Sequence, residues 1–332
     1  MIAHAWSLVV VTASTLALAS GLPANAQTPA PANPDSPATA TPPAPKPAVV
    51  QPRRFESPED AMQAFVAALR AGDTGALLRI LGSEGRTLIS SGDPVSDRQT
   101  RERFLQAYDE AHTLVTNGNT VTARVGNDDW PFPIPLVKEH DRWRFDVRQG
   151  REEIIARRIG RNELYTVKAC LAYVDSQREY YAEDRNGAGI LEYAQKFAST
   201  PGKHDGLYWP TTSDEPPSPL GPLVVRARAE GYRRSEGGGP TPFYGYLYRI
   251  LTAQGSDAPG GAYDYITRGH MIAGFALVAF PAQYGVSGVM TFIVSHDGVV
   301  YQKDLGPNTR SIASAVRVFN PDRTWTQVED PT

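Results

Sequence analysis

The stretch GFALVAFPAQYGVSGVMTFIVSHDGVVYQKDLG, residues 274–306, decides the fold of the C-terminal part of the chain. Apolar and polar residues alternate along it, and glycines and Pro281 interrupt the alternation. The pair Asp297-Gly298 separates two apolar runs, which is a strong short-range signal for a β-hairpin. The run GVMTFIVS, residues 288–295, is apolar on both faces, which is typical of a strand buried on more than one side. The stretch therefore predicts an antiparallel meander with this run as a central strand.

An amphipathic helix over residues 162–181 is expected to cover this meander. Its apolar residues recur at steps of three and four, so they share one side of the helix. They are Leu164, Val167, Leu171 and Val174. The only cysteine, Cys170, lies beside this stripe, and we expect it to be a buried, unreactive thiol. Just before the helix, Arg151, Arg157, Arg158 and Arg161 alternate with glutamates. We interpret this charged run as a solvated, ion-paired helix face.

Residues 55–155 predict helices followed by a curved antiparallel sheet, which together make an α+β unit. Ser57 and Pro58 are typical of a helix start, and Gly72 of its end. A short second helix is expected to begin at Asp73. A third helix is indicated by Phe104, Leu105, Tyr108 and Ala111 on one face.

The sheet of this unit is predicted from WPFPIPLVKEHDRWRFDV, residues 130–147. Proline occupies every second position from Pro131 to Pro135, so alternate backbone donors are missing and the segment suits only an edge strand or an extended lead-in. Leu136-Val137 and Trp143-Arg144-Phe145 then flank a polar turn at residues 139–142, which predicts a hairpin.

The N-terminus resembles a secretory signal. An apolar run from Leu8 to Leu18 leads to Ala24-Asn25-Ala26, a small-x-small cleavage site that would leave Gln27 as the new N-terminus. We therefore expect residues 1–26 to be a signal peptide and the protein to be periplasmic or extracellular. No further stretch of the sequence suits a membrane span, so no transmembrane segment is expected after signal removal.

Residues 27–54 are rich in proline and alanine and contain no aromatic residue. Such a segment cannot bury enough apolar surface to offset the entropy of ordering, so we expect a disordered linker. The formal net charge of the chain is −3, which argues against nucleic acid as a partner, because phosphate binding needs a basic excess. Two folded domains are expected, at residues 55–155 and 156–332.

Several segments of the chain resemble a known sequence family. These are RNELYTVKACLAYVDSQREYYA, DGLYWP, PPSPLGPLV, YGYLYRILTAQG, APGGAYDY and SGVMTFIVSHDGVVYQKDLG. They are similar to the uncharacterised bacterial domain-of-unknown-function family numbered 2950, over about residues 55 to 328. The resemblance implies no particular activity.

Two looser resemblances concern architecture. AFVAALRAGDTGALLRIL followed by WRFD is similar to the nuclear-transport-factor-2-like cones, which implies a pocket, sometimes with a catalytic Asp or His. The candidates here are Asp93, Asp128, Asp129 and His112, and we interpret the aspartates as turn residues. The helix of residues 162–181 with its meander is similar to the head domain of type IV pilin-like proteins. The prepilin cleavage motif and the exposed apolar N-terminal helix of that group are missing from the sequence, which puts filament assembly in doubt.

Candidate binding residues come from an excess of tyrosine in the second domain. Tyrosine suits both a half-buried interface within the protein and a surface that binds a glycan, peptide or partner protein. The candidate ligand-binding residues are Tyr208, Trp209, Tyr244, Tyr246, Tyr248, Tyr263 and Tyr265.

One segment is compatible with a weak calcium site. Asp184, Asn186 and Glu192 supply oxygen ligands in a D-x-N-x-x-G context, but the positions where an EF-hand needs acidic ligands hold Ala188 and Gln195. A structural turn explains the same residues. No cofactor other than calcium is expected.

These observations predict an exported, non-enzymatic binding or structural module of the bacterial cell envelope. Its partner would be a protein, a peptide or a glycan. Two alternatives stay open: an envelope hydrolase or other enzyme with a pocket in or between the domains, and an accessory protein of a pilus or secretion system.

Overall fold

The computed structural model describes residues 49–233 and 240–329 of the chain. The predicted signal peptide and residues 27–48 of the predicted linker lie outside the described residues. Residues 50–53, at the end of that predicted linker, pair with the folded chain: the Val50 N–H donates to Ser83 Oγ at 2.7 Å and the Arg53 N–H to the Arg79 carbonyl at 3.0 Å. Within the described ranges, no helix has both the length and the apolar character that crossing a membrane needs.

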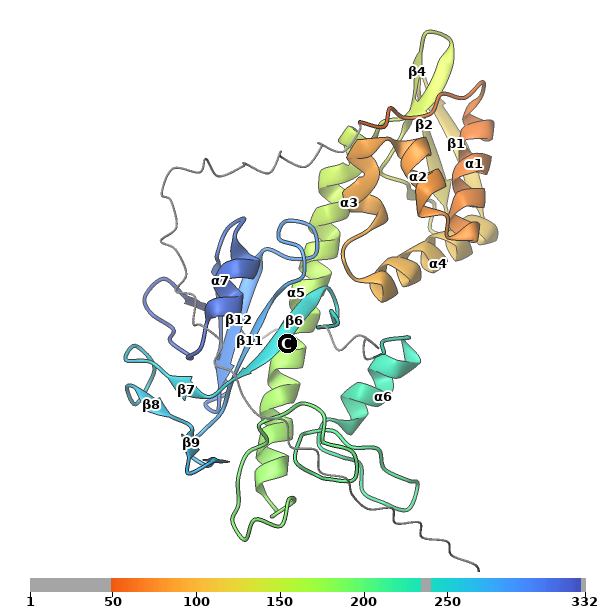
Figure 1. Cartoon of the computed structure of the whole chain (residues 1–332). Helices are drawn as coiled ribbons and strands as arrows, with labels where there is room; N and C mark the ends of the chain where they lie inside the picture. Colours follow the sequence, from red (N-terminus) through yellow and green to blue (C-terminus); the bar gives the residue numbers. More distant parts are fainter. Residues whose placement is uncertain (1–48, 234–239, 330–332) are drawn as a thin grey trace, which may run out of the picture. The chain divides into compact units, whose positions relative to one another are not determined.

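The fold is α+β, as predicted, with sheets in which every strand pair is antiparallel (Figure 1). The helices are α1 (Pro58–Ala71), α2 (Thr74–Leu81), the 3-10 turn η1 (Ser83–Gly85), α3 (Arg86–Ile89), α4 (Pro94–Glu110), α5 (Val147–Tyr181), α6 (Gly221–Ala229) and α7 (Thr309–Ala315). The strands of the first sheet are β1 (His112–Asn117), β2 (Thr120–Val125), β3 (Trp130–Pro131), β4 (Leu136–Glu139) and β5 (Arg142–Phe145). The later strands are β6 (Tyr246–Leu251), β7 (Ala253–Gln254), β8 (Tyr263–Asp264), β9 (Ile266–Thr267), β10 (His270–Met271), β11 (Ala276–Pro281), β12 (Met290–Ser295), β13 (Val300–Asp304) and β14 (Thr326–Gln327).

The first helices begin and end where the sequence indicates. Ser57 caps α1 by accepting from the Asp60 N–H at 3.0 Å, and Gly72 ends it in the left-handed conformation with φ of 63°. Asp73 caps α2 through the Ala76 N–H at 2.8 Å. The apolar sides of α1 and α2 pack with the sheet in one hydrophobic core, which includes Met62 and Phe145.

The first sheet has the strand order β1-β2-β4-β5, and β3 pairs only with β2. The proline-rich segment therefore lies at an edge, as its missing donors require. The predicted hairpin joins β4 and β5 through His140 and Asp141, whose φ angles are 50° and 63°. Two consecutive positive φ angles are typical of a type I′ turn, which matches the twist of the flanking strands.

Helix α5 is longer than the sequence indicates and belongs to both hydrophobic cores. It starts at Val147, which is buried in the first core, and continues to Tyr181. Val167, Tyr173 and Val174 from its second half are buried in the second core, together with the strands of the C-terminal sheet. The single helix thus crosses the predicted domain boundary at residues 155–156.

The second sheet has the order β14-β13-β12-β11-β6, with β12 in the middle as predicted. The predicted packing of the helix on this sheet is found: α5 contacts β11, β12 and β13 (Figure 1). Tyr173 Oη lies 3.3 Å from the Ala276 carbonyl oxygen. The turn after β12 differs in detail from the predicted turn, which had Asp297 and Gly298 at its centre. Gly298 alone has positive φ, at 81°, and its N–H donates to the Ser295 carbonyl, so His296 and Asp297 are the central residues of the turn.

Candidate functional site

A cavity of about 400 Å³ lies in the first part of the described chain, beside the α4 and α5 helices. It is of the size typical of small-molecule sites. Its apolar lining consists of Phe65, Leu69, Leu77, Leu81, Leu88, Ile89, Phe104, Ala107, Val125, Trp130, Phe132, Pro133, Ile134 and Ile154. Its polar lining consists of Asp97, Thr100, Arg101, Arg103, Arg157, Arg158 and Arg161.

The apolar part of the lining comes from several segments that lie far apart in the sequence. The buried sides of α1 and α2 provide Phe65 and Leu77, and the proline-rich segment provides Phe132. The Phe65, Phe104 and Phe132 rings lie 5.0–5.9 Å apart, centroid to centroid, in tilted and edge-to-face arrangements. Such ring pairs hold their geometry well, so this part of the cavity has a defined shape.

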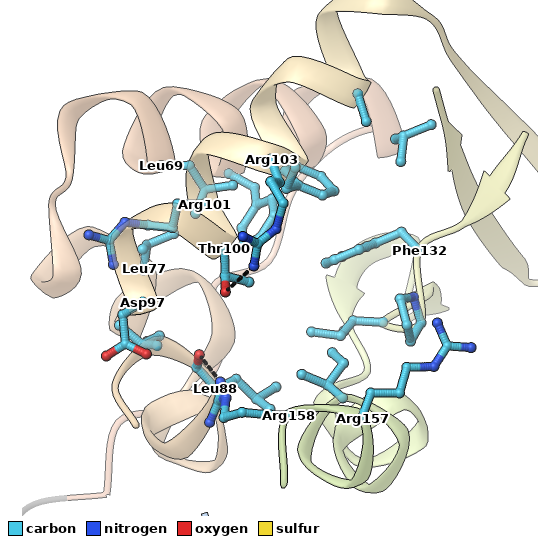
Figure 2. A pocket seen from close by; sticks show the side chains of 18 of the residues that line it. Leu69, Leu77, Leu88, Asp97, Thr100, Arg101, Arg103, Phe132, Arg157 and Arg158 are labelled. Carbon is cyan, nitrogen blue, oxygen red and sulfur yellow. Dashed lines mark hydrogen bonds between the residues drawn. The ribbon is translucent and has the colours of Figure 1, made fainter. Parts of the chain in front are cut away.

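Besides Asp97 and Thr100, the polar part consists of five arginines from two helices. Arg101 and Arg103 project from α4, while Arg157 and Arg158 project from α5 on the facing side of the cavity (Figure 2). Arg161 follows one turn later on α5 and lines the same cavity. We call Arg101, Arg103, Arg157, Arg158 and Arg161 the arginine group.

The arginines differ in what they contact. Arg157 pairs with Glu153 at 2.5 Å. Arg158, only 7% exposed, donates to the carbonyls of Thr87 and Leu88 at 2.7 and 3.0 Å. Arg103 donates to the neutral hydroxyl of Thr100 at 3.2 Å. Within residues 49–233 and 240–329, no ion pair involves the other four members of the group, Arg101, Arg103, Arg158 and Arg161.

Burial and mutual repulsion act on two of these guanidinium groups. The pKa of Arg161 is lowered, first by burial and then by the positive charge of Arg103. The pKa of Arg158 is lowered mainly by burial, partly offset by Asp97, and is lowered further by Arg161. Arginine keeps its proton in proteins, so these groups remain charged and the repulsion persists.

The single carboxyl group in the lining is already hydrogen-bonded. Asp97 accepts from the Ser91 N–H at 3.0 Å and from the Ser91 hydroxyl at 2.7 Å. Burial raises its pKa, which the hydrogen bonds from Ser91 partly offset. The lining therefore combines a large apolar surface with an excess of positive charge, and it can hold an apolar molecule beside a cationic group.

The predicted tyrosine residues lie at several places and at different depths. Tyr246 and Tyr265 are fully buried, and their hydroxyls donate to the Met290 carbonyl and to Gln254 Oε1 at 2.9 and 3.0 Å. Trp209 is 8% exposed and stacks on His204 with ring centroids 4.3 Å apart.

The other four predicted tyrosines, Tyr208, Tyr244, Tyr248 and Tyr263, are half-buried. The Tyr244 ring stacks on that of Tyr165 at 4.3 Å, and the Arg228 guanidinium lies 5.0 Å from the Tyr208 ring. None of the seven predicted residues lines the cavity. Ligand binding by the half-buried tyrosines stays a prediction.

The predicted calcium residues form a turn. The Asp184 carboxylate accepts from the N–H groups of Ala188 and Gly189 at 3.0 and 2.8 Å. Glu192, which is buried, accepts from Asn186 Nδ2 and lies 3.0 Å from His270 Nδ1. These oxygens already have donors in the protein. Among the residues that the structure describes, no group of three or more His, Cys, Asp or Glu side chains is arranged to hold a metal ion. Calcium binding stays a prediction.

The resemblance to the nuclear-transport-factor-2-like cones gave four candidates for a catalytic Asp or His, and none of the four lines the cavity. Asp93 is fully buried and caps α4. Asp129 pairs with Arg124, and Asp128 is exposed. His112 stacks on Tyr108, with ring centroids 3.9 Å apart.

The arginine group is the feature that the sequence analysis missed. Arg157 does form the ion pair expected of the charged run, but Arg158 is buried and does not belong to a solvated face, so that interpretation is wrong for Arg158. A signal exists in the sequence: Ile154, Arg158 and Arg161 are spaced i, i+4 and i+7, so they share one side of a helix. Arginines in line with an apolar residue indicate a buried or cavity-facing position.

A family model described as Protein of unknown function (DUF2950) matches residues 52–328, which is most of the chain. No curated protein and no solved structure matches the chain. The resemblances to the cone-shaped domains and to the pilin heads therefore rest on architecture alone.

Proposed function

Since the chain belongs to the DUF2950 family of proteins of unknown function, we propose its function from the chemistry of the cavity. The protein is an exported, non-enzymatic binding module of the cell envelope, and it holds a small molecule with a large apolar surface in this cavity. The observation that carries the proposal is a cavity of about 400 Å³ whose lining is mostly apolar and includes Arg101, Arg103, Arg158 and Arg161, none of which forms an ion pair within the described residues. Export rests on the apolar run and small-x-small site that precede Gln27.

The side chains around the cavity support binding. Within the described part of the chain, Asp97 is the one carboxyl group that lines the cavity, it is hydrogen-bonded to Ser91, and no histidine or cysteine lines the cavity. General acid–base catalysis depends on a positioned side chain, most often His, whose pKa lies near the operating pH. Neither of the two alternatives, an envelope enzyme or an accessory of a pilus or secretion system, is favoured by a specific contact within the described residues.

The proposal is tested by filling the cavity. Ala107 on α4 lines it, so the Ala107→Trp substitution places an indole in the space that a ligand needs. The probe is N-phenyl-1-naphthylamine, a neutral aromatic molecule whose fluorescence rises in apolar surroundings. We expect one molecule of probe to bind per chain and the substitution to weaken binding at least tenfold.

Gln106→Trp is the matched control, because Gln106 is the exposed neighbour of Ala107 and lies outside the lining. It adds the same side chain to the same helix and should bind the probe like the unmodified protein. Circular dichroism and urea unfolding check that both variants are folded. No binding by the unmodified protein, or equal binding by folded Ala107→Trp, would overturn the proposal.

A further inference from the structure

Arg103 and Arg161 line the same cavity as the apolar side chains, and neither forms an ion pair within the described residues. Arg103 on α4 and Arg161 on α5 are close enough for the charge of one to lower the pKa of the other. Arg158 adds a third guanidinium, although its hydrogen bonds to the Thr87 and Leu88 carbonyls hold it in the wall. Charges of one sign from two different helices thus face the same space.

This arrangement costs stability unless something else compensates for it. Like charges repel, and partial burial removes the water that would screen them. Asp97 is the single acidic residue that the described part of the chain contributes to the lining, and its two oxygens accept from Ser91. A ligand with a negative charge would remove the repulsion and fill the open donor positions of Arg103 and Arg161. Guanidinium groups suit oxyanions because their N–H groups form a planar fork that matches two oxygens.

The apolar lining sets the second requirement. Phe65, Phe104 and Phe132 line the same cavity as the arginines, and their rings offer no hydrogen-bond partner. A small inorganic anion would leave this space unfilled, whereas a molecule with an apolar chain or ring would fill it. Charge and shape together select an amphipathic anion.

We propose that the ligand is an amphipathic organic oxyanion, with an aliphatic or aromatic body among the phenylalanine rings and a carboxylate or phosphate head group between Arg103 and Arg161. This inference rests on the proposed binding function and adds the chemical class of the ligand. Arg101 lines the same cavity and adds to its positive potential.

The test compares three probes with the same twelve-carbon chain: dodecanoate, dodecyl phosphate and the neutral dodecan-1-ol. Each displaces N-phenyl-1-naphthylamine from the purified protein at low ionic strength, below its micelle concentration. We expect at least one of the two anions to bind tenfold or more tightly than the alcohol, whichever head group is preferred. Because charge drives the difference, it should shrink as salt is added.

Two charge-matched double variants locate the head group. Arg103→Gln/Arg161→Gln should bind the anions no better than the alcohol, while its affinity for the alcohol should stay within threefold of the unmodified protein. Arg86→Gln/Arg151→Gln removes the same net charge from two exposed arginines outside the lining, and it should keep the preference for anions.

The outcomes separate the two proposals. Equal binding of anions and alcohol by the unmodified protein would overturn the ligand class and leave the binding function standing. An equal loss of the anion preference in both double variants would also overturn it, since net charge would then explain the result. Failure of N-phenyl-1-naphthylamine itself to bind would overturn the binding function together with the inference built on it.

Discussion

Asp93 is a fully buried carboxylate that accepts hydrogen bonds from distant parts of the chain. Its Oδ1 accepts from the N–H groups of Val95 and Ser96 at the start of α4, at 3.1 and 3.0 Å. Its Oδ2 accepts from the Tyr232 hydroxyl at 2.9 Å and from the Gly245 N–H at 2.8 Å. The residue thus joins the first helices to the segment before β6.

We predict that Asp93→Ala lowers the free energy of unfolding by at least about 3 kcal/mol. It removes a helix cap, worth about 1 kcal/mol, and leaves buried donors unpaired, at about 1–3 kcal/mol each. Asp73→Ala is the control, because Asp73 also caps a helix but its side chain is 51% exposed, and it should cost about 1 kcal/mol. Urea unfolding measures both. Equal costs would contradict the role given to Asp93.

At the scale of elements, the start of α5 is fixed by a close approach to the proline-rich segment. A Cβ atom at Gly150 would lie 2.2 Å from the Pro133 carbonyl oxygen, so only glycine fits there without a backbone shift. Pro133 and Ile134 line the cavity, and Arg158 lies two turns farther along the helix. The contact therefore sets the distance between the apolar wall and the arginine group.

Two glycine-to-alanine substitutions in α5 should have opposite effects. Gly150→Ala should destabilise the protein by about 1–3 kcal/mol, because backbone must move to admit the methyl group. Gly160→Ala should stabilise it by roughly 0.5–1 kcal/mol, because Gly160 has no atom within 4 Å of its added Cβ and alanine favours the helix. Thermal or urea unfolding gives both values. A destabilised Gly160→Ala variant, or a neutral Gly150→Ala variant, would show that this part of the helix is packed differently.

At the scale of the whole molecule, tyrosine is the residue that ties the α5 helix to the second sheet and its loops. Tyr173, Tyr180, Tyr246 and Tyr265 are each at most 2% exposed. Burial raises the pKa of all four, and that of Tyr180 to about 12. The unfolded chain, in contrast, releases these protons near pH 10.

The sign of the resulting pH dependence follows from proton binding. Above pH 10 the folded state holds more protons than the unfolded state, so stability is fully present below pH 10 and falls as the pH rises toward the folded-state pKa values. Each buried tyrosine contributes a fall of about 1.4 kcal/mol per pH unit in that window. We predict a steep loss of stability between pH 10 and 12. Urea unfolding at pH 9, 10 and 11, with tyrosinate absorbance as a second readout, checks this, and a stability that is flat across that range would contradict it.

The sequence by itself determined the parts of the fold that depend on neighbouring residues. Helix caps at Ser57 and Asp73, the alternating prolines at an edge and the apolar run of β12 are local patterns, and the α+β class follows from them. The family follows from the similarity of residues 52–328 to its other members. The covering of the second sheet by α5 could also be predicted, because a helix with one apolar side must bury it against another apolar surface.

Only the tertiary structure decided the site. The cavity needs Phe65 from α1, Phe132 from the proline-rich segment and Arg161 from α5, which lie far apart in the sequence. The burial of Arg158 was equally hidden, since a charged run predicts a solvated helix face, and only the packing against Thr87 and Leu88 places Arg158 in the wall of the cavity. Charge and periodicity are properties of single segments, whereas a cavity is the space left between several segments, and its position depends on how they pack.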